Sequence, residues 1–104
     1  MCSHKMEMIV KIQTVKQLGA IVKQVRQSQA IVQETAGLLS GNGLTFVSQF
    51  ENGKETVEIG RVFKLLEQLG IKVELNLPPN LSNKIVNKLL SNQDITIKKL
   101  QTFT

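Results

Sequence analysis

Few side chains in this sequence could carry catalytic or metal chemistry. Cys2 and His4 stand close together near the N-terminus, and they are the only cysteine and the only histidine of the chain. A zinc site needs about three or four Cys, His or carboxylate ligands, and no such cluster is present. The "GNG" stretch at 41–43 lacks the Lys-Ser/Thr of a P-loop and the third glycine of a dinucleotide-binding loop. We therefore expect no enzyme, no metal and no cofactor.

Composition favours a small globular protein. The chain has 104 residues, of which 41% are apolar and 20% charged, enough for one compact domain with an appended tail. No run of about 18 apolar residues is present, and the N-terminus lacks the features of a secretory signal. The single cysteine excludes an internal disulfide. We expect a cytoplasmic protein without membrane contact.

The net charge of +5 is concentrated at the two ends of the chain. Residues 1–29 hold five basic residues against one acidic residue, and residues 76–104 hold four lysines against one aspartate. The middle of the chain is close to neutral. This distribution is compatible with a polyanionic partner but does not require one.

A first helix is predicted from residue 14 to residue 28. Thr14 can cap it, and Gln17 completes a capping box. The apolar residues at helical spacing form one buried stripe: Leu18, Ile21, Val22 and Val25. The basic residues outside this stripe are predicted to face solvent: Lys16, Lys23 and Arg26.

A second clear helix is predicted from residue 56 to residue 69. Thr56 is the expected cap, Glu58 lies in the first turn, and Gly70 stands at the C-terminal end. Its apolar residues predict a core-facing side: Val62, Phe63, Leu65, Leu66 and Leu69.

The segment "IKVELNL" at 71–77 alternates apolar and polar residues, which predicts a strand that Pro78 and Pro79 end. A lone strand needs a partner for its backbone groups. Two pairing partners are possible: the N-terminal run "IVKIQ" at 9–13, or the same strand of a second subunit. We favour the second, a homodimer held by four apolar side chains: Ile71, Val73, Leu75 and Leu77.

About 27 residues separate the two clear helices, too many for a structureless connection in a small domain. Two short helices at 33–40 and 44–51, joined by the "GNG" turn, would account for them. Four side chains would then meet at the junction: Ala36, Leu39, Val47 and Phe50. This is the arrangement of a helix-turn-helix. The alternative is a small helical core with a glycine-rich loop.

The residues from 15 to 75 resemble the Xre/Cro-type helix-turn-helix family, and within it the HipB-like antitoxins of bacterial toxin–antitoxin operons. The resemblance rests on "LGAIVKQVRQ", Gln33, Gly41, "FVSQFENGK" and "RVFKLLEQLGI", in the order and spacing of the family. It implies a mostly α, lambda-repressor-like bundle of four to five short helices, with a C-terminal β-strand that pairs across a dimer. The expected domains are an N-terminal arm or short strand (1–13), the helix-turn-helix domain with its dimerising strand (14–77), and a C-terminal helix and tail (78–104).

The resemblance also implies DNA-binding positions. These are the glutamine that opens the first short helix, the recognition helix, and the "ENGK" element: Gln33, Gly43, Leu44, Thr45, Ser48, Gln49, Asn52 and Lys54. Chemically, a glutamine can pair with adenine, hydroxyls can bond bases or phosphates, and a leucine can lie on a thymine methyl group.

The sequence departs from the family pattern in two respects. Val32 cannot cap the helix that Gln33 opens. Ala36–Gly37 replaces a leucine-alanine pair that is usual in the family, and Asn42 replaces a valine or isoleucine, so we expect a loosely held helix. No basic residue occurs from Ala30 to Gly53, and phosphate attraction usually supplies much of the affinity for DNA. Weak DNA binding by the protein alone is therefore a further expectation.

The implied function is a DNA-binding antitoxin that represses its own operon from a palindromic operator, at the nucleoid, and assembles with a HipA-like serine/threonine kinase toxin or an accessory subunit. The alternatives are a stand-alone Xre-type repressor and an interaction scaffold with weak DNA binding. Two hypotheses are possible for the C-terminal tail. Leu100 and Phe103 either dock on the partner or belong to a frayed end behind a small capping helix at about 81–90.

Overall fold

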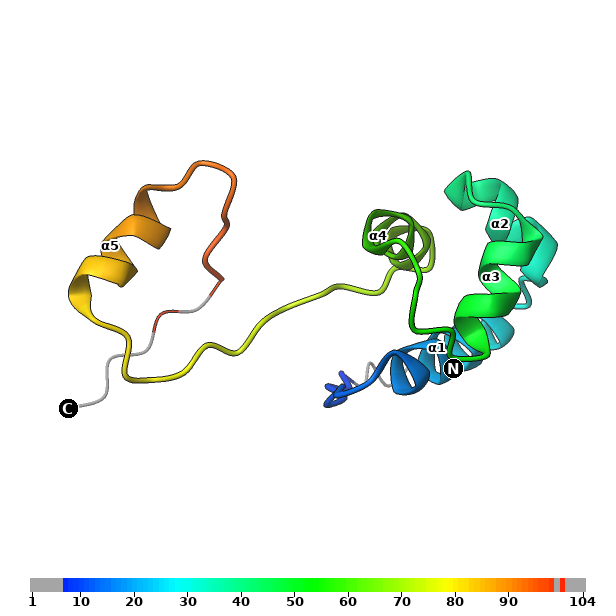
Figure 1. Cartoon of the computed structure of the whole chain (residues 1–104), viewed down its shortest axis with the longest axis horizontal. Coiled ribbons are helices and arrows are strands. Elements are labelled where there is room, and N and C mark those ends of the chain that lie inside the picture. The colour runs from blue at the N-terminus through cyan, green and yellow to red at the C-terminus, as the bar shows by residue number, and fades with distance from the viewer. Residues whose placement is uncertain (1–6, 99, 101–104) are drawn as a thin grey trace, which may run out of the picture. The chain divides into compact units, whose positions relative to one another are not determined.

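The computed structural model describes residues 7–98 and residue 100. The chain divides into two compact units, 1–72 and 73–104. The first unit holds α1 (Val15–Ser28), α2 (Gln33–Ser40), α3 (Leu44–Glu51) and α4 (Ile59–Gln68), and the second holds α5 (Asn83–Ser91) (Figure 1). Among the described residues, no helix has the length and apolar character needed to span a membrane.

The capping box of α1 is formed as predicted. The Gln17 backbone N–H donates to Thr14 Oγ1 at 3.1 Å, and Thr14 N–H donates to Gln17 Oε1 at 3.2 Å. These two bonds satisfy backbone donors that the first turn leaves without a helical partner. The helix therefore begins where the sequence predicts it.

The start of α4 differs from the prediction. Thr56 does not cap it: the helix begins at Ile59, and its N-cap is Glu58, which makes no side-chain cap hydrogen bond. Val57 packs, partly buried, against the core, and Glu58 has an extended backbone, so both residues lie before the helix. Gly70, with φ at 74°, follows the helix in the left-handed conformation expected of a helix end.

The core of the first unit is contributed by all four helices. α3 contacts both α1 and α2, and α2 also contacts α4. The buried apolar residues are Val22, Ala36, Val47, Phe50, Val62, Leu65, Leu66 and Leu69.

Two predicted core residues, Leu39 and Phe63, are instead 53% and 50% exposed. Leu39 precedes the buried Ser40 and Phe63 follows the buried Val62, and consecutive helical residues point roughly 100° apart. The faces of α2 and α4 that meet the core are therefore narrower than the apolar pattern suggests.

α1 and α3 approach each other backbone to backbone at Gly19. A Cβ built on Gly19 would lie 2.2 Å from the Phe50 carbonyl oxygen and 3.2 Å from Glu51 Cα. No side chain fits this gap, so the glycine fixes how closely the two helices pack. Its position in "LGAIV" is explained by this contact rather than by any need for flexibility.

The predicted strand at 71–77 is not confirmed. The described residues contain no strand, either at 71–77 or in the alternative partner "IVKIQ" at 9–13. Ile71 packs against the core, whereas Val73, Leu75 and Leu77 are at least half exposed. A strand that pairs across a two-fold axis needs the second subunit to complete its ladder.

The second unit has no buried residue in its helix. α5 forms close to the predicted position, and Ser82 Oγ accepts from the Ile85 N–H at 3.4 Å as its cap. Lys98 Nζ pairs with Glu74 Oε1 at 2.5 Å. None of the described residues of this unit is buried, so they gain little hydrophobic stabilisation from packing.

The close approach at Gly19 predicts that Gly19→Ala strongly destabilises the protein, because the added methyl group would overlap the Phe50 carbonyl. Gly60→Ala is the matched control: it also lies in a helix, but its Cβ would meet nothing within 4 Å. The control should gain about 0.5–1 kcal/mol from lower unfolded-state entropy. Chemical denaturation measures both changes, and equal effects of the two substitutions would contradict the helix contact.

Candidate nucleic-acid interface

The turn between α2 and α3 is closed by two glycines in the left-handed region. Gly41 has φ at 73° and Gly43 has φ at 90°. Between them, Asn42 Nδ2 donates to Ser40 Oγ at 3.1 Å and to the Arg61 carbonyl at 2.9 Å. The asparagine therefore ties the turn both to the end of α2 and to α4.

Gly37 brings α2 against the turn. A Cβ at this position would lie 2.6 Å from the Gly43 carbonyl carbon and 2.7 Å from its oxygen, and the Gly37 carbonyl accepts from the Asn42 and Gly43 N–H groups. The expectation that Gly37 and Asn42 loosen this helix is wrong. Both residues hold α2 to the turn, although Val32 makes no side-chain cap bond, as predicted.

α3 presents a polar face opposite its buried face. Val47, Phe50 and Glu51 are buried. The predicted contact residues lie on the other side or beside the helix: Leu44, Thr45 and Gln49 are exposed and Ser48 is half-buried, with exposed Gly43 before the helix and exposed Asn52 and Lys54 after it. The seven predicted positions from Gly43 to Lys54 thus lie on α3 or directly before or after it.

Basic groups adjoin this polar face. Lys54 Nζ donates to Gln49 Oε1 at 3.2 Å. Gly53 lies against Lys16, since its Cβ would be 3.2 Å from Lys16 Cβ, which brings a second lysine next to the turn after α3. These two lysines therefore place positive charge beside α3, which has no basic residue of its own.

Arg61 is a candidate residue that the sequence analysis did not identify. Its guanidinium lies 6.0 Å from the centre of the Phe46 ring and pairs with Glu58 at 3.1 Å. Arg61 lines a shallow groove together with Thr45, Gln49 and Lys54. The sequence feature that could have indicated this role is its position in the first turn of α4, seven residues after Lys54.

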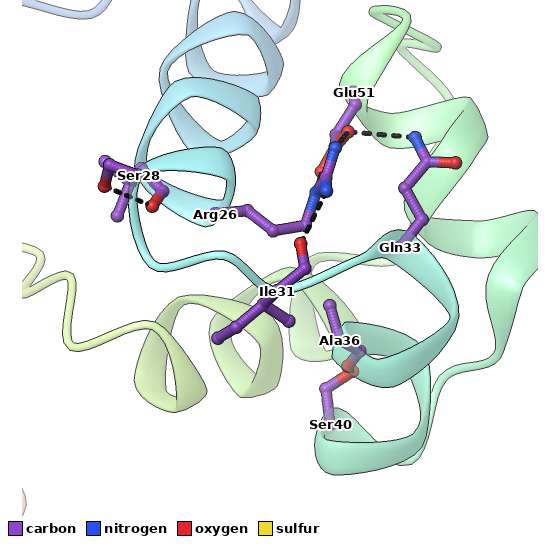
Figure 2. Close-up of polar contacts among 8 residues, drawn as sticks. Arg26, Ser28, Ile31, Gln33, Ala36, Ser40 and Glu51 are labelled. Atoms are coloured by element: carbon purple, nitrogen blue, oxygen red, sulfur yellow. Dashed lines mark hydrogen bonds and ion pairs between the residues drawn. The ribbon is translucent and has the colours of Figure 1, made fainter.

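Gln33 joins α2 to the far end of α3 through a buried ion pair (Figure 2). Its Nε2 donates to Glu51 Oε1 at 2.9 Å. Arg26 holds the same carboxylate with two bonds, from Nε at 2.6 Å and from Nη2 at 2.9 Å, and its Nη1 donates to the Ile31 carbonyl at 2.7 Å.

Arg26 is 6% exposed, so its predicted solvent-facing position is wrong. The hydrogen bonds that Arg26 donates to Glu51 raise the pKa of Arg26 above its ordinary value, which keeps the guanidinium charged. Because its charge is compensated inside the protein, Arg26 does not contribute to attraction of a phosphate backbone. The apolar stripe of α1 alone could not reveal this role; Glu51 lies 25 residues away in sequence.

Of the other predicted site residues, Ile71 packs against the core of the first unit. Val73, Leu75, Leu77 and Leu100 lie in the second unit, and Phe103 is outside the described residues. Within the described part of the chain no group of His, Cys, Asp and Glu side chains is arranged to hold a metal ion.

The buried pair predicts a large cost for Arg26→Met, about 3–5 kcal/mol, because Glu51 would keep a buried charge without its cation. Adding Glu51→Leu should recover much of this loss. Arg61→Met is the matched control: its pair with Glu58 is exposed on both sides, and such pairs contribute about 0–1 kcal/mol. Urea denaturation of the wild-type protein and these three variants tests this, and a double variant no more stable than Arg26→Met alone would contradict it.

No protein-family model matches the chain. The uncharacterized HTH-type transcriptional regulator y4mF of Sinorhizobium fredii is 35% identical over 71 residues, which is 68% of this chain and 93% of that protein. A chain of the HipA-HipB-O2-O3 complex has a TM-score of 0.62 at 28% identity, covering 65% of this chain and 96% of the other. The restriction-modification controller protein C.AhdI of Aeromonas hydrophila has a TM-score of 0.52 at 28% identity, covering 56% and 84%.

Proposed function

The chain belongs to the helix-turn-helix transcriptional regulators, and from this premise we propose that it is an antitoxin that binds a palindromic operator and represses its own operon. Regulation by DNA binding, rather than catalysis, is the activity of this family. The observation that carries the proposal is the exposed polar face of α3, held at a fixed angle by the α2–turn contact at Gly37. A recognition helix of this kind reads base edges in the major groove.

The residues divide into two roles. Thr45, Ser48 and Gln49 on α3, together with Gln33 at the start of α2, are the proposed base or phosphate contacts, and Leu44 packs on a thymine methyl group. Gly43 lets the backbone enter the helix. Asn52 and Lys54 contact phosphates, and we add Arg61 to this group because it lines the same groove as Lys54.

The two roles predict different responses on the DNA upstream of the chain's own gene. Gln33→Ala and Gln49→Ala should each cost roughly 1–3 kcal/mol on the operator and little on random DNA. Lys54→Ala and Arg61→Ala should weaken both alike and reduce the salt slope by about 1 each. Fluorescence anisotropy at several salt concentrations measures these quantities.

Lys64→Ala is the control for charge. Lys64 is an exposed lysine of α4 that does not line the groove, so its loss should leave the salt slope nearly unchanged. If neither glutamine substitution alters discrimination between operator and random DNA, the recognition-helix assignment is wrong.

We propose that the protein acts as a homodimer through residues 71–77. Leu75 is 80% exposed, and Val73 and Leu77 are also largely exposed, which is an apolar surface that pairing with a second copy would cover. A two-fold dimer matches a palindromic operator because it presents two recognition helices to two half-sites. In this proposal the domain boundary stays at residue 77, so that the strand belongs to the DNA-binding domain.

A dimer through this segment predicts that Val73→Pro yields monomer, because proline removes a backbone donor from the ladder. Glu74→Ala is the control, since it changes a polar neighbour and keeps every backbone N–H. Sedimentation at micromolar concentration reads the mass directly. A monomeric wild-type protein, or a dimeric proline variant, would sink the proposed interface.

The proposed partner is a HipA-like serine/threonine kinase toxin or an accessory subunit, with Leu100 and Phe103 as docking side chains. Support comes from the fold shared with a chain of the HipA-HipB-O2-O3 complex and from Leu100, which is 60% exposed. A kinase gene beside this one would favour the proposal. The absence of such a gene would favour the stand-alone repressor. If the protein does not bind the upstream DNA, the interaction scaffold becomes the favoured alternative.

A further inference from the structure

Glu51 is an acceptor shared by two donors from different elements. Its Oε1 accepts from Arg26 Nη2 and from Gln33 Nε2, each at 2.9 Å, while Oε2 accepts from Arg26 Nε at 2.6 Å. Glu51 is 6% exposed. Figure 2 shows the Gln33 nitrogen turned toward Glu51 and its amide oxygen turned away.

The carboxylate decides which way the Gln33 amide faces. An ionised carboxylate has only acceptor atoms, so it can bond the NH₂ group of a glutamine but not its oxygen. The bond to Glu51 uses one N–H, which leaves Oε1 and the second N–H for another molecule. A glutamine without this bond would rotate freely between its two amide orientations.

We infer that Glu51, held by Arg26, is a positioning residue that fixes the amide orientation of Gln33 and thereby sets its preference for adenine. The inference rests on the proposed DNA-binding function. A donor beside an acceptor complements the N7 acceptor and N6 donor that adenine presents in the major groove. Guanine presents two acceptors there, so the fixed Oε1 finds no donor.

Burial makes this arrangement stable enough to matter for specificity. The Arg26–Glu51 pair is enclosed, and Arg26 also bonds the Ile31 carbonyl in the connection that leads into α2. One network therefore joins α1, the α1–α2 connection, α2 and α3. An amide held in its binding orientation loses less side-chain entropy when it meets a base.

The experiment compares two neutral replacements of Glu51 in a background that removes the buried charge. Arg26→Met/Glu51→Leu cannot accept a hydrogen bond from Gln33, whereas Arg26→Met/Glu51→Gln retains an amide oxygen that can. Both are combined with Gln33→Ala. Circular dichroism verifies folding, and binding is measured on the duplex upstream of the gene, on random DNA, and on duplexes with each A·T pair changed to G·C.

In the wild-type background, Gln33→Ala should lower the operator preference roughly 5- to 150-fold, the fold-change equivalent of one good base contact. In the Arg26→Met/Glu51→Leu background the same substitution should change the operator preference less than about twofold, because the Gln33 amide there has already lost the bond that fixes its orientation. The Glu51→Gln version should retain more of the adenine preference than the Glu51→Leu version.

A folded Arg26→Met/Glu51→Leu protein with wild-type operator preference would overturn the positioning role. So would an equal effect of Gln33→Ala in both backgrounds. A wild-type protein that does not distinguish the upstream duplex from random DNA would instead refute the proposed function itself, so the two failures are separable.

Discussion

The hydrogen bonds to the buried carboxylate of Glu51 hold together the helices that carry the proposed recognition surface. Glu51 lies at the C-terminal end of α3, and it is bonded by Arg26 from α1 and by Gln33 from α2. Every buried side-chain nitrogen or oxygen in the described residues has a hydrogen-bond partner. A satisfied polar network of this kind restrains three helices in one arrangement, whereas an apolar contact would allow them to slide.

Backbone proximity supplies the second constraint. Gly19 lets α1 lie against the end of α3, and Gly37 lets α2 lie against the turn that starts α3. α3, the proposed recognition helix, is therefore fixed at both ends by contacts that admit no side chain. Since readout of base edges requires placement well within an ångström, rigid support of this sort favours specific recognition.

Electrostatics around α3 come from residues outside it. Arg26 is buried and its charge is compensated by Glu51, so it cannot attract DNA. Lys16, Lys54 and Arg61 are exposed and lie beside the helix or its following turn, and the pair of Arg61 with Glu58 is open to solvent. In the proposed function, the charge that attracts DNA and the groups that read it are thus on different segments. Affinity and specificity can then change separately, because phosphate contacts carry no sequence information.

The sequence by itself determined the helices and the turn. Helical spacing, the Thr14–Gln17 capping box and the glycines at 41, 43 and 70 are local features, and local sterics and hydrogen bonding are enough to decide them. The family resemblance predicted DNA contacts from Gly43 to Lys54, and the structure places these residues on α3 or directly beside it. The approach of Gly37 to the turn, the burial of Arg26, the exposure of Leu39 and Phe63, and the late start of α4 were decided only in the tertiary structure. Each depends on what lies opposite a residue in space, as Glu51 lies opposite Arg26, and no periodicity along the chain encodes that pairing.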